Sequence, residues 1–267
     1  MILEKTYVLL RTRYKNQIEN LTISDVRIGV LLSAVILSDG SCGVSSSVTD
    51  SHSFCDKKNR DFGDFSPLKI KGQKVIDLLE TDKKSNAIDS LKIAVLNAIS
   101  SKLLATSDYN IIDNCDPIDL INLSSNKTIT IVGGFQTYIQ RISGTNNKLY
   151  VLELNENALS EEQKQFYVPA EQYAKILPAS DIVIITGLTL VNNTIEGLLS
   201  SISPDTQVIV TGPSSSIIPD ILFENKVNII GATRITDPDL LLSVAGEAGA
   251  GFHLFKYCAS KICILNN

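Results

Sequence analysis

Residues 181–186 read Asp-Ile-Val-Ile-Ile-Thr and residues 207–211 read Gln-Val-Ile-Val-Thr. Both are short runs of β-branched residues without polar alternation, which is typical of strands covered by helices on both faces of a parallel sheet. Similar runs at 128–132, 149–152 and 227–230 alternate with segments compatible with helices. We therefore expect the carboxyl-terminal half to be α/β, with a Rossmann-like, doubly wound parallel sheet.

The amino-terminal half follows a different pattern. Apolar periodicity predicts helices at 2–20, 72–80 and 87–104, and β-rich runs at 26–37 and 43–48 flank the turn Ser-Asp-Gly-Ser, which predicts a hairpin. The polar stretch 49–67 is expected to be a surface loop, and 111–125 a connection. We expect an α+β domain at residues 1–115 and the Rossmann-like domain at 116–267.

Composition excludes several classes of protein. The 267 residues are 44% hydrophobic and 20% charged, with a net charge of −5, so affinity for nucleic acid is not expected. We also expect no membrane span and no secretory signal, and therefore a cytoplasmic protein. Five scattered cysteines without a Cys-x-x-Cys pair predict free thiols. The expected partner is a small-molecule ligand, and the sequence leaves open whether the chain forms a homo-oligomer.

Candidate site residues follow the predicted strands. In doubly wound sheets, ligands bind at the carboxyl ends of the strands, beside helix starts. The first four strands are followed by glycine or polar residues, namely Gly133-Gly134-Phe135, Glu153, Thr186-Gly187 and Gly212-Pro213-Ser214. A long polar loop that contains Thr189, Asn192, Asn193 and Thr194 follows the third strand.

Each of these segments also has a purely structural interpretation. Gly133 and Gly134 could serve a tight turn, Asn192 or Asn193 could cap a helix near Thr194, and the serines after Pro213 could cap another. Glu153 lies 20 residues beyond Gly133, as a ribose-binding acid does in dinucleotide folds. The Gly-x-Gly-x-x-Gly fingerprint is incomplete, so a nicotinamide cofactor has little support.

Several co-linear motifs resemble one family. They are IVGGF, VLE, ASDIVIITGLTLVNNTIEGLL, VIVTGPSSSIIPDILF and NIIGATRITDPDLLLSVAGEAG, together with the hairpin and the AVLNA segment around Asn97. The chain is similar to the putative heavy-metal chelation family of unknown function, whose members join an enolase-amino-terminal-like domain to a Rossmann-like domain. The resemblance implies a ligand cleft between the two domains and a role in metal chelation or metal-cofactor metabolism.

The resemblance also implies which residues bind the ligand. The family's motifs match Gly133, Phe135, Glu153, Thr186, Gly187, Asn192, Thr194, Gly212, Pro213, Ser214 and Asn97, and Gly134 joins them from the strand-end argument. The chain departs from the family at Gln136, where members commonly carry proline, and at Ser215 and Ser216, where they carry Thr-Pro. Catalytic residues and direct metal ligands are not assigned.

Metal ligands are scarce in the sequence. His52, Cys55 and the nearby Cys42 are the candidates for a soft-metal site in the first-domain loop, although tight sites normally have three or four ligands at regular spacing. Packing explains His253 and Cys258. No P-loop, Gly-x-Ser-x-Gly or His-Glu-x-x-His motif is present.

We therefore expect the protein to bind or process a small anionic or metal-chelating metabolite. The sequence does not identify a cofactor, and a metal ion and a metal chelate are the two candidates. We further hypothesise that any metal arrives already complexed. The alternatives are an enzyme that uses a nucleotide or S-adenosyl cofactor, with Glu153 on its ribose, and a scaffold without a ligand. Whether the protein catalyses a reaction stays open.

Overall fold

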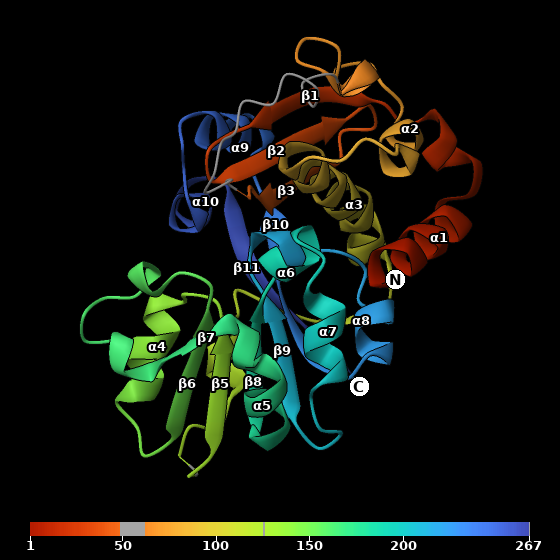
Figure 1. Cartoon of the computed structure of the whole chain (residues 1–267). Helices are drawn as coiled ribbons and strands as arrows, with labels where there is room; N and C mark the ends of the chain where they lie inside the picture. The colour runs from red at the N-terminus through yellow and green to blue at the C-terminus, as the bar shows by residue number, and fades with distance from the viewer. Residues whose placement is uncertain (49–61, 125, 267) are drawn as a thin grey trace.

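The computed structural model describes residues 1–48, 62–124 and 126–266. Their strands form a three-stranded sheet and an eight-stranded sheet, and helix α3 (Asn86–Thr106) lies against the small sheet on the side that faces the large one (Figure 1). None of the helices in these ranges combines the length and apolar character that crossing a bilayer requires.

The small sheet is antiparallel, with strands β1 (Ile23–Ile28), β2 (Leu32–Leu37) and β3 (Cys42–Ser46) in that order. The predicted hairpin around Asp39 is confirmed, but the single strand predicted over 26–37 is wrong. The chain turns at Gly29, where a Cβ would lie 1.9 Å from the carbonyl oxygen of Ala245, so close packing against helix α9 (Pro238–Gly246) requires glycine.

Alternation along β2 sends its side chains to two different cores. Val35 and Leu37 pack with α3, whereas Leu32 and Ala34 pack with α9. The approach of α3 is close because Gly43 has no side chain, and a Cβ there would lie 2.0 Å from the carbonyl oxygen of Ala94. The sheet is therefore held between two helices.

Two further helices complete this half of the chain. Helix α1 (Ile2–Tyr14) passes into a 3-10 helix, η1 (Lys15–Asn20), so the helix predicted over 2–20 ends earlier as an α-helix. Helix α2 (Val75–Glu80) is shorter than the predicted 72–80, and a 3-10 turn, η3, spans Gly63–Phe65. The rest of the predicted surface loop, residues 49–61, lies outside the described residues.

The large sheet has the order β4-β11-β10-β9-β8-β5-β6-β7. Its parallel strands are β5 (Thr128–Val132), β6 (Lys148–Glu153), β7 (Tyr167–Pro169), β8 (Ile182–Thr186), β9 (Gln207–Thr211) and β10 (Val227–Ile235). Numbered along the chain, these six strands lie in the order 3-2-1-4-5-6, which is the order of dinucleotide-binding sheets. The predicted Rossmann-like α/β fold is confirmed.

Helices cover both faces of this sheet, as the uniformly apolar strands predict. Ile182 and Ile184 pack with α4 (Gln136–Ser143), whereas Val183 and Ile185 face the helices of the opposite side. The connections include α5 (Tyr173–Ile176), α6 (Leu188–Val191), α7 (Ile195–Ser200), α8 (Asp220–Glu224) and α10 (Gly251–Tyr257), and the 3-10 helices η4 (Pro117–Leu120), η5 (Glu156–Ala158), η6 (Lys164–Phe166), η7 (Ala170–Gln172), η8 (Leu177–Ala179) and η9 (Pro213–Ser215).

Two antiparallel strands extend the sheet beyond the prediction. β11 (Ala259–Leu265) pairs with β10, and β4 (Asn110–Asp113) pairs with β11 at the edge. Part of the predicted connection 111–125 is therefore a strand of the large sheet. β4 is short and mostly exposed, so it lacks the apolar run by which buried strands are recognised.

One apolar core extends across both sheets. It contains Leu91, Val95 and Ile99 of α3 together with Ile217 and Ile218, which follow β9. A buried hydrogen bond accompanies this packing, in which Ile218 N–H donates to Ser100 Oγ (3.0 Å). The carboxyl ends of the large sheet are thereby fixed against the small sheet.

Candidate functional site

The large sheet changes winding direction between β5 and β8, and ligands of such folds bind at that point. A pocket of about 430 Å³ lies there, which we call the switch pocket. Six of the twelve predicted residues line it: Gly133, Gly134, Glu153, Thr186, Asn192 and Thr194.

The turn after β5 requires glycine. Gly133 has φ +110°, and a Cβ there would lie 3.1 Å from Cβ and Cγ2 of Thr186. Gly134 is different, because its Cβ would point towards Glu153 Oε2 at 3.7 Å and meet no atom closer than 3.6 Å. Gly133 thus sets the turn, while Gly134 leaves the wall of the pocket open.

The carboxylate of Glu153 is held at the end of β6. Its Oε1 accepts hydrogen bonds from the backbone N–H groups of Leu154 (2.8 Å) and Asn155 (3.2 Å). Oε2 accepts none from the described residues and is the oxygen nearer to Gly134. Glu171 also lines the pocket, which has no lysine, arginine or histidine among its described lining residues.

The loop after β8 is ordered by its own hydroxyl and amide groups. Thr189 Oγ1 donates to the carbonyl oxygen of Thr186 (2.7 Å). Asn192 Oδ1 accepts from both N–H and Oγ1 of Thr194, at 3.2 and 2.7 Å. Thr194 is the N-cap residue of α7 and makes no side-chain cap hydrogen bond, so the interpretation of Asn192 or Asn193 as the cap is wrong.

The turn after β9 uses its hydroxyls within the protein. Ser214 Oγ accepts from Ser46 N–H of β3 (2.8 Å), and Ser215 Oγ lies 2.7 and 2.6 Å from the carbonyl oxygens of Gly212 and Gly231. Asn97 of α3 donates through Nδ2 to the carbonyl oxygens of Val44 (2.7 Å) and Pro213 (3.3 Å). Asn97 and Ser214 therefore join the small sheet to the large one, and their role as ligand residues stays a prediction without support from these contacts.

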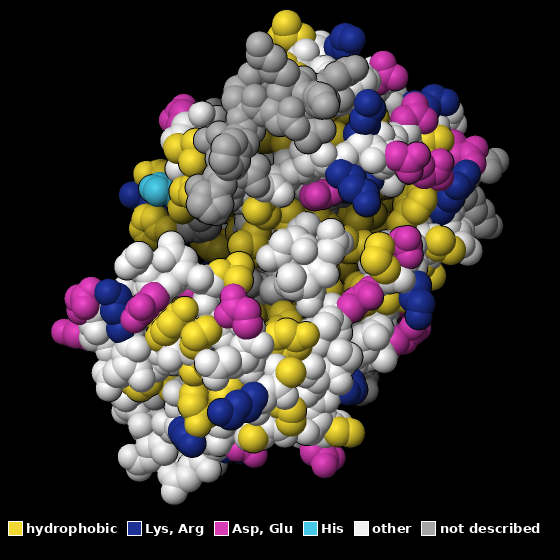
Figure 2. Space-filling model, viewed as in Figure 1, with side chains coloured by type: hydrophobic (Ala, Val, Ile, Leu, Met, Phe, Trp, Pro, Cys, Tyr) yellow, Lys and Arg dark blue, Asp and Glu magenta, His cyan; other side chains and the backbone are white. Residues whose placement is uncertain are grey.

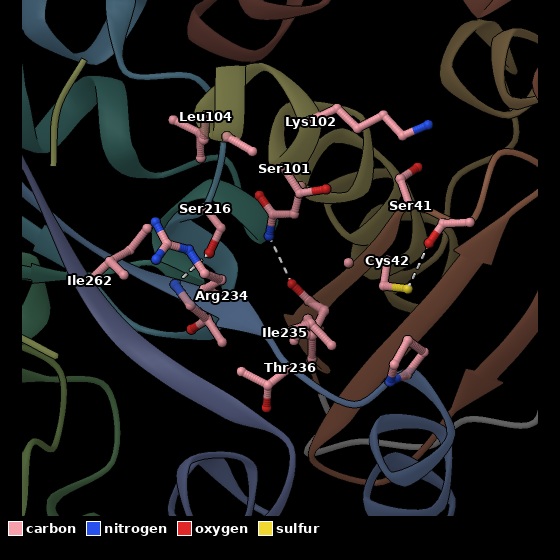
Figure 3. A pocket seen from close by; sticks show the side chains of 17 residues that line it. Ser41, Cys42, Ser101, Lys102, Leu104, Ser216, Arg234, Ile235, Thr236 and Ile262 are labelled. Carbon is pink, nitrogen blue, oxygen red and sulfur yellow. Dashed lines mark hydrogen bonds between the residues drawn. The ribbon is translucent and has the colours of Figure 1, made fainter. Parts of the chain in front are cut away.

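The twelve predicted residues do not meet in one cleft. Gly134, Phe135, Gly212 and Pro213 line a second pocket of about 810 Å³, and Gly187 packs where a Cβ would lie 2.9 Å from Ser215 N. Asn97 lines a third pocket of about 390 Å³, in which residues of α3 such as Ser101 face Arg234 and Ile235 of β10 (Figure 3).

The switch pocket differs from the predicted interdomain cleft, because all its lining residues fall between 132 and 198. Figure 2 shows a hollow lined by apolar side chains between the two parts of the molecule. Sequence reasoning missed Glu171 and Tyr173, which line the switch pocket from the segment after β7. That strand has three residues, too few for a recognisable pattern.

Metal ligands do not cluster in the described residues, which contain no group of three or more histidine, cysteine, aspartate or glutamate side chains able to hold an ion. His52 and Cys55 lie outside the described residues. Cys42 is buried, and burial raises the pKa of its thiol to about 11, which disfavours the thiolate that a metal needs.

The interpretation of His253 and Cys258 as packing residues holds for Cys258, which is 1% exposed. His253 is exposed and contacts the rings of Phe252 and Tyr257 at the surface, and its Nδ1 accepts from Ala250 N–H (3.0 Å), so it packs outside the core.

Solved structures share this fold along the whole chain. A protein of unknown function from Pyrococcus horikoshii, of the DUF364 family, superposes with a TM-score of 0.79 at 18% identity, covering 100% of both chains. A protein of the same family from Desulfitobacterium hafniense gives a TM-score of 0.71 at 17% identity, covering 97% of this chain and all of the other.

Comparison of sequences also finds relatives and family models that match this chain. An uncharacterised protein of Methanocaldococcus jannaschii is 26% identical over 175 residues, and the match spans 64% of this chain and 64% of that relative. Residues 116–264 match the DUF364 family model and residues 11–100 match a second model, DUF4213. Both models carry the description "Putative heavy-metal chelation". Because the DUF364 model matches more than half of the chain, the chain belongs to the DUF364 family, described as putative heavy-metal chelation.

Proposed function

We propose that the protein binds a small metal chelate in the switch pocket and recognises it through the organic or ammine groups around the metal. The observation that carries this proposal is the gathering of glycine, hydroxyl, amide and carboxylate groups at the switch point of the sheet. Such groups recognise hydrogen-bonding ligands and have no strong preference for a bare soft metal.

The described side chains do not fit a directly bound heavy metal. No group of three or more candidate ligands occurs among them, and burial also raises the thiol pKa of Cys258 and Cys263. The metal would therefore arrive as cargo inside a complex, and it has no catalytic step in this proposal.

The charge of the switch pocket narrows the ligand class. Its described lining contains Glu153 and Glu171 and no basic side chain, so a ligand with net negative charge would be repelled. We therefore propose a neutral or positively charged complex in place of the anionic metabolite expected from the sequence. Glu153 Oε2, Asn192 and Thr194 would accept or donate hydrogen bonds to its outer groups, without exchanging ligands with the metal.

A thermal-unfolding screen with three defined complexes tests this proposal. Hexaamminecobalt(III) is inert and cationic, the nickel(II) bis-histidine complex is neutral, and nickel(II) citrate is anionic. At a concentration of about 100 times Kd, a ligand adds about 2.7 kcal/mol to the free energy of unfolding, which raises Tm by about 5–10 °C. We expect this rise with the first two complexes, and a much smaller one with nickel(II) citrate or aqueous nickel(II).

Matched variants locate the binding. Glu153→Gln should remove most of the rise in Tm, while Glu247→Gln, an exposed residue that does not line the pocket, should leave it unchanged. The proposal fails if aqueous nickel(II) alone gives the larger rise, or if Glu153→Gln has no effect. The screen also includes ATP and S-adenosylmethionine, and a rise with these alone would favour the cofactor-dependent enzyme instead.

A further inference from the structure

We propose that the protein has a second ligand site, on the other side of the β5–α4 turn, which takes a flat aromatic carboxylate. The site is the pocket of about 810 Å³ between α4, η9, α10 and the strands β10 and β11, which we call the aromatic pocket. It is distinct from the switch pocket, and of its described lining residues only Gly134 is common to both.

Aromatic side chains form much of its wall. Phe135 and Tyr138 stack with ring centroids 5.3 Å apart, and Phe252 and Phe255 of α10 lie on another side. Phe252 lines this pocket and is 72% exposed, so a bound ligand would cover apolar surface there. A flat ring bound beside Phe252 would bury exposed apolar surface and stack on its face.

The charge of this wall is opposite to that of the switch pocket. Asp116 accepts from Lys261 Nζ (2.5 Å) and from Tyr138 Oη, so its carboxylate is already compensated. Lys256 makes no ion pair with any residue of the described ranges, and its Nζ lies 5.0 Å from the centroid of the Tyr257 ring. One carboxylate and two ammonium groups thus leave a positive pocket on a chain whose net charge is −5.

An ammonium group without an ion-pair partner beside the exposed Phe252 ring is the arrangement that favours a ligand with both a ring and a negative charge. A carboxylate on such a ring can pair with Lys256 while the ring itself stacks on Phe252. An aliphatic carboxylate would lose the stacking, and a neutral aromatic amide would lose the ion pair. The aromatic carboxylate is therefore the class that uses both features.

Gly134 places the two sites next to each other. Gly134 lines both pockets, and a Cβ on it would point towards Glu153 in the switch pocket. The backbone of Gly134 therefore separates the two pockets. The inference does not depend on the proposed function, because the two pockets share no charged side chain.

The probe for this site is 2-naphthoate, whose fluorescence can be followed directly because the chain contains no tryptophan. We expect saturable binding of one naphthoate per chain, and several-fold weaker binding of 2-naphthamide and cyclohexanecarboxylate. Phe252→Ala should weaken naphthoate binding about fivefold. Lys256→Gln should weaken it about threefold, as befits an exposed ion pair. Both positions are exposed, and circular dichroism checks that the variants fold.

Glu153→Gln separates this site from the switch pocket, because it should leave naphthoate binding unchanged while it removes hexaamminecobalt(III) binding. The inference is overturned if 2-naphthamide binds as tightly as 2-naphthoate, or if neither Phe252→Ala nor Lys256→Gln weakens the binding. Loss of naphthoate binding in Glu153→Gln would likewise overturn it, since the probe would then occupy the switch pocket.

Discussion

Replacing Asn97 by alanine tests whether this residue holds the two sheets together or binds a ligand. Asn97 is 2% exposed, and the variant removes the hydrogen bonds to the carbonyl oxygens of Val44 and Pro213. Each bond contributes about 1 kcal/mol net, and the carbonyls left behind are enclosed. The side-chain Oδ1 has no partner among the described residues, so its loss offsets part of the cost.

We therefore expect Asn97→Ala to lower the free energy of unfolding by about 2 kcal/mol and Tm by about 4–8 °C. Urea unfolding followed by far-ultraviolet circular dichroism measures this change. Ser101→Ala is the matched control, because Ser101 lies one turn further along α3 and is exposed. Its effect should stay within about 0.5 kcal/mol.

The reasoning is refuted if Asn97→Ala unfolds at the same urea concentration as the unmodified protein. If that variant also lost binding of hexaamminecobalt(III) or 2-naphthoate while its stability was unchanged, Asn97 would be a ligand residue, as the sequence predicts. A stability loss with unchanged binding would assign Asn97 to the junction between the sheets.

Four further variants test the turns and the ion pair. Gly133→Ala should cost about 2 kcal/mol in urea unfolding, because alanine is strained at φ +110° and its Cβ would press on Thr186; an unchanged midpoint would contradict this. Gly134→Leu should abolish binding of hexaamminecobalt(III) by filling the switch pocket, while Gly134→Ala, whose Cβ has room, should keep it; equal binding by both would count against the pocket. Burial alone would raise the pKa of Asp116, but the hydrogen bonds from Lys261 and Tyr138 outweigh burial and lower the pKa. The charged form therefore stabilises the fold above the unfolded-state pKa of about 3.9, and this contribution is lost as pH falls through the lower folded-state pKa. Asp116→Asn should thus flatten the acid side of the stability curve measured by thermal unfolding, and an unchanged acid slope would refute this.

The parallel sheet could be predicted from the sequence because each buried strand has a strong local signal. Runs such as 182–186 and 207–211 are apolar on both faces, and the helices that cover them contact Ile184 and Ile185 from opposite sides. The strand-end rule then placed Gly133, Glu153 and Thr186 correctly at one edge, where all three line the switch pocket.

The rest depends on contacts between distant segments, which local patterns do not encode. β4 is a strand only because β11 offers it an edge, and Gly29 marks a turn only because α9 packs there. Ser214 and Asn97 have the residue types of a ligand site, yet their partners are backbone atoms of other elements. Sequence spacing gives no information on which of these partners a side chain meets.

The hydrogen bonds between the sheets also limit how far the two parts of the molecule can move apart. Opening the molecule like a hinge would break the bonds from Ser46 to Ser214, from Asn97 to Pro213 and from Ile218 to Ser100. At about 1 kcal/mol each, these three contacts alone would keep an opened form below about 1% of the population. Entry to the space beside Glu153 needs no such opening, because the described residues that line it all lie between 132 and 198, within the part that carries the large sheet. A guest molecule can therefore exchange at this pocket while the two sheets stay joined.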